Sequence, residues 1–162
     1  MISKKRFLTL IILTLFGILI SGCAPKDISF ETIAKQVRVV QDHDKSLQLQ
    51  AITNVAASHI AGLAPEDEAK LQAIDYSKYW ALMVVYGSGA GDGDNINNIS
   101  QQGGVIYVRA ELLPQSDGEL LGSAYQIVLI KKTQMILDGA TTFRLMDQSG
   151  KERVAVTQEI VP

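Results

Sequence analysis

Apolar and polar positions alternate in several segments of the chain after residue 29, which is the pattern of β-strands that bury one face. In Val105–Leu112 the even-numbered positions are all apolar, whereas the odd-numbered ones include Tyr107, Arg109 and Glu111. A period of two puts the two sets on opposite faces of a strand. This segment therefore predicts a half-buried strand with a polar outer face.

A different pattern marks the centre of the chain. Tyr79–Tyr86 is a run of eight apolar or aromatic residues, which predicts a strand buried on both faces. Turn-forming residues separate other alternating segments and predict hairpins. The expected hairpins are 36–41 with 46–52 and 141–146 with 153–156, and further strands are expected at 96–99 and 125–130.

Two short helices are expected between the second and third strands. Asn54 would cap the first, which runs to Ile60. Pro65 suits the first position of the second, and the acidic residues 66–68 complement its positive end. Leu71 and Ile74 would face inward. The sequence thus predicts an α+β fold, mostly antiparallel β, in the form of a compact small sandwich or half-barrel with two short helices.

Composition narrows the possible functions. The chain has 162 residues, enough for one domain with a core of its own. Its 15 basic and 17 acidic residues nearly balance, whereas a nucleic-acid binder should be basic. A single Cys excludes an internal disulfide and any multi-Cys metal site.

The N-terminus has the features of an export signal. Lys4, Lys5 and Arg6 precede the apolar stretch Phe7–Ile20, which is shorter than a membrane-spanning helix requires. Ile20-Ser21-Gly22-Cys23 resembles the lipobox of bacterial lipoproteins. The resemblance implies cleavage before Cys23 and attachment of lipid, including palmitate-like acyl chains, to that residue. An uncleaved anchor with an incidental Cys is the alternative, and the short apolar stretch argues against it.

The expected organisation follows from this signal. Residues 1–22 are a lipoprotein signal peptide, residues 23–29 are the lipidated Cys and a short tether, and residues 30–162 are one β-rich domain. Cleavage removes three of the basic residues and none of the acidic ones, which leaves an acidic domain. The expected location is the cell membrane or outer membrane, with the domain on the extracytoplasmic side.

Candidate chemistry is sparse. Asp92 and Asp94 in the glycine-rich segment 87–94 have a spacing that suits calcium ligands, although the later ligands of a calcium loop are missing and a plain loop is the other interpretation. Asp42-His43-Asp44 is more typical of a polar turn than of a metal site. His59 is expected to be a partly buried packing residue. No nucleophile motif appears, so no catalytic, cofactor-binding or metal residue is assigned, and no cofactor is expected.

Aromatic residues offer two possible surfaces. Tyr107 shares a polar face with Arg109 and Glu111, and Tyr and Arg are enriched where proteins bind one another. These three residues are the candidate partner surface. A groove lined by aromatic side chains is the other possibility, although a place in the core is expected for Trp80. The six candidates for that groove are Tyr76, Tyr79, Trp80, Tyr86, Tyr107 and Tyr125.

Several segments resemble a known family. Ala73–Gly87 is similar to the segment of PrcB-like domains in which Asp-Tyr and a Lys precede a hydrophobic strand and a Gly. Further similarities follow in order at 96–99, 105–112 and 123–128, and residues 30–33 resemble the start of such domains. Departures are the longer loop ending Asp92–Asn95 and Ala124 in place of the usual Pro. PrcB-like domains occur in subunits of bacterial protease complexes, so the resemblance implies an accessory lipoprotein without catalytic residues.

Together these observations predict an exported, membrane-anchored lipoprotein. It would act as a non-catalytic binding or stabilising subunit of an envelope or surface protein complex, with a protease among the candidate partners. The alternative is a lipoprotein that binds a small envelope ligand or glycan through exposed aromatic residues. An enzyme is the third class, and the missing motifs argue against it.

Overall fold

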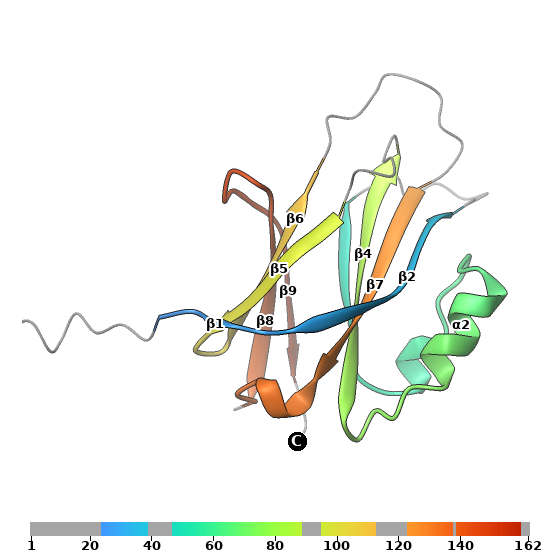
Figure 1. Cartoon of the computed structure of the whole chain (residues 1–162), viewed down its shortest axis with the longest axis horizontal. Helices are drawn as coiled ribbons and strands as arrows, with labels where there is room; N and C mark the ends of the chain where they lie inside the picture. Colours follow the sequence, from blue (N-terminus) through green and yellow to red (C-terminus); the bar gives the residue numbers. More distant parts are fainter. Residues whose placement is uncertain (1–23, 39–46, 89–94, 113–122, 138, 160–162) are drawn as a thin grey trace, which may run out of the picture.

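Two β-sheets packed face to face form the body of the protein (Figure 1). The computed structural model describes residues 24–38, 47–88, 95–112, 123–137 and 139–159. One sheet has the strand order β1-β5-β6-β8-β9 and the other has the order β2-β7-β4-β3. The strands are β1 (Lys26–Asp27), β2 (Phe30–Arg38), β3 (Gln48–Ile52), β4 (Tyr79–Ser88), β5 (Asn95–Gln102), β6 (Val105–Glu111), β7 (Ser123–Lys131), β8 (Ala140–Met146) and β9 (Glu152–Glu159).

Helical structure in the described residues is confined to three short elements. The α-helix α2 (Pro65–Gln72) begins with Pro as expected, and lies on the outer face of the four-stranded sheet (Figure 1). The other expected helix is a single 3-10 turn, η1 (Ala56–Ser58), and a second such turn, η2 (Lys132–Gln134), follows β7. The residue at the N-cap of η1 is Val55 and not the expected Asn54, although Asn54 Oδ1 accepts a hydrogen bond of 2.9 Å from the backbone of Ala57.

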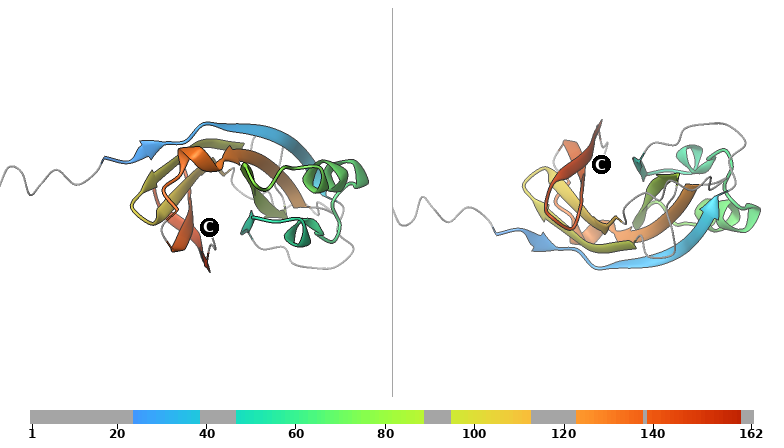
Figure 2. Two further views of the ribbon diagram at one scale, coloured as in Figure 1. Left: turned by 90° about the horizontal axis from the view of Figure 1, so that it is seen from below. Right: turned by 90° about the horizontal axis from the view of Figure 1, so that it is seen from above.

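The described strands confirm a β-rich α+β fold with mostly antiparallel sheets, and these sheets do not close into a barrel. β6 and β8 form the one parallel pair among the described ladders. The N-terminal strands join the two sheets, because β1 pairs with β5 and β2 pairs with β7. Figure 2 shows the resulting curved arrangement. At the opposite edges β3 comes close to β9, where Gln158 Nε2 lies 3.5 Å from Thr53 Oγ1.

The hydrophobic core has two parts, one on each side of the four-stranded sheet. The side of β4 that faces the five-stranded sheet carries Trp80, Leu82 and Val84. There the centre of the Trp80 ring lies 6.4 Å from the centre of the Phe143 ring. Alternate residues of β4 pack against the helical side, and Leu71 of α2 is fully buried there. The prediction that β4 is a central strand buried on both faces is confirmed, and so is the inward position of Leu71.

The expected hairpin of 141–146 with 153–156 is confirmed as β8 and β9. Its turn is held by Asp147, whose Oδ1 accepts hydrogen bonds from the backbone of Ser149 at 2.9 Å and of Lys151 at 3.0 Å. The Ser149 hydroxyl, which donates to the same oxygen, is the main cause that lowers the pKa of Asp147.

The other expected hairpin, which paired residues 36–41 with 46–52, is wrong. β2 pairs with β7 and β3 pairs with β4, so the two strands lie at opposite edges of the four-stranded sheet. Alternation indicates a strand but not its partner, because strands far apart in the sequence can supply the apolar neighbours that burial requires. The turn-forming residues 42–45 lie outside the described residues.

Candidate functional site

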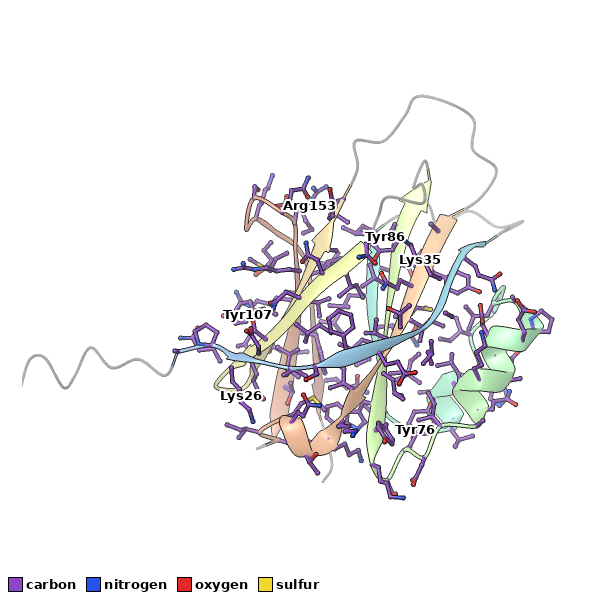
Figure 3. The ribbon with its side chains drawn as sticks, in the orientation of Figure 1. Lys26, Lys35, Tyr76, Tyr86, Tyr107 and Arg153 are labelled. Carbon is purple, nitrogen blue, oxygen red and sulfur yellow. The ribbon has the colours of Figure 1, made fainter. Side chains whose placement is uncertain are left out.

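The outer face of the five-stranded sheet contains the candidate partner surface. Along β6, Ile106, Val108 and Ala110 are fully buried, while Arg109 and Glu111 are exposed. Tyr107 is half-buried on the same face as Arg109, and Figure 3 shows it on the side away from the four-stranded sheet. Because α2 covers the four-stranded sheet instead, no helix of the described residues covers this face.

Register shows which residues neighbour the candidate surface. Tyr107 lies between Ser100 of β5 and Arg144 of β8, and the next outward residue along β6, Arg109, lies opposite Asn98. Asn98 Nδ2 in turn donates to Asp27 Oδ1 of β1 at 3.3 Å. The outer face therefore carries polar side chains from β1 to β8 around one aromatic ring, together with the partly buried Val105 and Met146.

The polar groups at the centre of this face differ from those at its rim. Arg144 Nη1 is paired with Glu152 at 2.9 Å, at the β9 edge. By contrast, the side chains of Tyr107, Arg109 and Glu111 have no hydrogen-bond or ion-pair partner within the described part of the chain. An incoming protein surface could therefore bind them without first breaking a pair within the described residues.

The aromatic residues do not gather into one groove. Trp80, Tyr86 and Tyr125 are buried, which confirms the core position expected for Trp80. Tyr76 is on the helical side of the four-stranded sheet, where its hydroxyl donates to the carbonyl of Leu71 at 2.9 Å, and Tyr107 is on the opposite sheet (Figure 3). Tyr107 and Tyr76 therefore do not belong to one platform on which a sugar ring could stack.

Asp67 of α2 is a buried polar residue that the sequence pattern did not predict. The side chain of Asp67 is fully buried, although residues 66–68 were all expected to act as helix-start charges. Its Oδ2 accepts a hydrogen bond of 2.7 Å from the hydroxyl of Tyr125, and its Oδ1 pairs with Lys70 Nζ at 2.8 Å. Burial, followed by the hydrogen bond to Asp67, raises the pKa of Tyr125 to about 12. This cluster fastens α2 to β7, with Asp67 and Tyr125 buried and Lys70 half exposed at its solvent side.

A second buried polar group joins the two sheets. Gln126 is 1% exposed, and its Oε1 accepts hydrogen bonds of 2.8 Å from both the Tyr86 hydroxyl and the backbone of Ile96. Its Nε2 donates to Thr32 Oγ1 at 2.9 Å. These partners come from β2, β4 and β5, so one side chain holds three strands in position. An alternating apolar strand gave no sign that a Gln would occupy a core position.

His59 is the one residue among the histidine and metal candidates that the structure describes. His59 is exposed, with 65% of its side chain accessible, and Nδ1 lies 3.1 Å from Glu68. The expectation of a partly buried packing residue was wrong. The buried residue of η1 is Ser58, and His59, which follows it, is exposed. The residues described by the structure contain no group of three His, Cys, Asp or Glu side chains that could hold a metal. Asp42–Asp44, Asp92, Asp94 and Cys23 lie outside them.

The described helices are all too short or too polar to cross a membrane. No protein-family model matches the chain, and neither curated proteins nor solved structures gave a match. The lipoprotein and PrcB-like interpretations therefore stay predictions.

Proposed function

We propose that the protein is an exported lipoprotein, anchored through acylated Cys23, that acts as a non-catalytic binding or stabilising subunit of an envelope protein complex. The observation that carries the partner-binding role is the outer face of the five-stranded sheet, which no helix among the described residues covers. There, Tyr107, Arg109 and Glu111 form a row of side chains without partners in the described parts of the chain.

The lipid anchor is supported by the order of features at the N-terminus. Basic residues, a short apolar stretch and Ile20-Ser21-Gly22-Cys23 occur in the sequence that lipoprotein processing requires. A residue carrying two or three acyl chains is stably held in a bilayer.

A protein partner is supported by the chemistry of the face. Tyr and Arg supply rigid apolar area together with hydrogen-bond donors, which is why they dominate the binding energy of many interfaces. The separation of Tyr107 from the other tyrosines argues against the alternative of a stacking groove for glycans. The PrcB-like resemblance of Ala73–Gly87 adds a protease, or its propeptide, to the partners to be sought.

Site-specific crosslinking in cells tests the proposal. A photoreactive phenylalanine analogue replaces Tyr107 in the lipidated protein, and covalent adducts are identified by mass spectrometry. The matched control carries the same analogue at Tyr79, which is also a half-buried tyrosine but lies at the start of β4. We expect one dominant adduct from position 107 and none from position 79. Equal background adducts from both positions would contradict binding through this face.

A further inference from the structure

β1 fixes the chain to the sheet immediately after the proposed anchor. Lys26 and Asp27 pair with Gln101 and Ser100 of β5, and the backbone of Ile28 donates to the carbonyl of Ile99 at 2.8 Å. Three residue steps separate Cys23 from Lys26, and these span at most about 11 Å even when fully extended. An acylated Cys23 therefore keeps this end of the five-stranded sheet within about one nanometre of the lipid headgroups.

The most exposed large hydrophobic side chain of the described residues lies at this same end. Ile136 is 62% exposed. Its backbone is held on both sides by Gln101, because Gln101 Oε1 accepts from the Ile136 N–H at 2.8 Å and Gln101 Nε2 donates to the Ile136 carbonyl at 2.7 Å. Gln101 is the residue that pairs with Lys26 and is 3% exposed. An apolar side chain is thus presented to solvent beside the anchored strand, on a firmly held loop.

Lysine side chains lie around the same end of the sandwich. Lys26 is exposed and, in Figure 3, extends toward the end that carries η2. Lys132 in η2 is partly exposed, and its Nζ lies 5.7 Å from the centre of the Trp80 ring, within the range of a cation–π interaction. An apolar side chain flanked by lysines is typical of surfaces that lie in the headgroup region of a bilayer.

We propose that this end of the sandwich rests on the membrane and that the Ile136 side chain contacts the lipid headgroup region. The inference rests on the lipid anchor of the proposed function. The apolar contact and the short tether supply the orientation, because the mature chain as a whole is acidic and would not be drawn to anionic lipid by its net charge.

Val55 supplies an internal comparison. It is the other large hydrophobic residue that is strongly exposed in the described residues, at 51%. It directly precedes η1, which packs with α2 on the helical side of the four-stranded sheet. If exposure alone drew side chains to the bilayer, both residues would touch lipid. The proposed orientation allows only Ile136 to do so.

Fluorescent labelling of the anchored protein tests this orientation. The sequence contains one Cys, and acylation blocks its thiol, so Ile136→Cys and Val55→Cys each supply one reactive thiol in the lipidated full chain. Each variant carries an environment-sensitive dye and is reconstituted into vesicles of phosphatidylethanolamine and phosphatidylglycerol. We expect blue-shifted emission and several-fold weaker quenching by an aqueous quencher at position 136 than at position 55.

The outcomes separate this proposal from the one on which it rests. Mass spectrometry first establishes whether Cys23 is acylated, and an unmodified Cys23 would overturn both the anchor and the orientation. Acylated protein whose label at 136 is as accessible to the aqueous quencher as the label at 55 would overturn the orientation alone. Greater protection at 55 would do the same, because the helical side would then face the bilayer.

Discussion

Removing one oxygen atom from Tyr125 is expected to weaken the attachment of α2 to the sheet. The hydroxyl donates to Asp67 Oδ2 at 2.7 Å, and both side chains are buried, at 1% and 0% exposure. Tyr125→Phe leaves that buried carboxylate oxygen without its donor. A hydrogen bond to a charged group contributes about 1.5–3 kcal/mol, so we expect a loss of about 2–3 kcal/mol in the free energy of unfolding.

Trp80 provides the assay, since it is the single Trp of the chain and is 1% exposed. Its fluorescence during urea denaturation in detergent reports unfolding of the core. Tyr79→Phe is the matched control, because it removes the hydroxyl of a half-buried tyrosine that makes no side-chain hydrogen bond among the described residues, and we expect a loss of no more than about 0.5 kcal/mol.

A double-mutant cycle with Asp67→Asn isolates the interaction between the two side chains. Residues that share a buried hydrogen bond show non-additive effects, so the double variant should lose less stability than the sum of the two single variants. Strict additivity, or a Tyr125→Phe loss no larger than that of Tyr79→Phe, would refute the view that this hydrogen bond stabilises the docking of α2.

Three further outcomes are expected. The folded state keeps the proton on Tyr125 up to a pKa of about 12, against 10.0 for an ordinary tyrosine, so the corresponding stability is complete below pH 10 and is lost as pH rises toward 12. The wild-type protein should lose about 2 kcal/mol more than Tyr125→Phe over that interval in urea titrations. Gln126→Leu removes the buried oxygen that accepts hydrogen bonds from both the Tyr86 hydroxyl and the Ile96 amide. We expect the free energy of unfolding to fall by about 2–4 kcal/mol in the same fluorescence assay. A loss below about 1 kcal/mol would mean that these two donors find other acceptors. Cys23→Ser should move the protein to the aqueous phase on membrane fractionation, or leave an uncleaved precursor. A processed variant that stayed with the membrane would contradict the lipoprotein interpretation.

The strands were predictable because burial of one face imposes a period of two on the sequence. β6 and β8 show this period, and the eight-residue apolar run gave the interior strand β4. β1 could not be found in this way, since Lys26 and Asp27 are both exposed and two residues define no period. The parallel pairing of β6 with β8 was also beyond local patterns, because strand direction depends on how the whole chain packs.

Polar residues inside the fold were the least predictable part. Asp67 in the first turn of α2 and Gln126 in β7 occupy positions where their types are normally exposed. Each is buried because partners far along the chain supply its hydrogen bonds, such as Tyr125 for Asp67. A sequence shows the donor and the acceptor separately but not that folding brings them together.

The proposed membrane-facing end and the proposed partner surface together limit where a partner protein can lie. Asp27 of β1 lies opposite Ser100, and Ser100 lies opposite Tyr107, so the row of outward residues on β6 begins two strands away from the anchored strand. The seven residues of β6 span about 23 Å. A protein bound along Tyr107, Arg109 and Glu111 would then lie within a few nanometres of the bilayer.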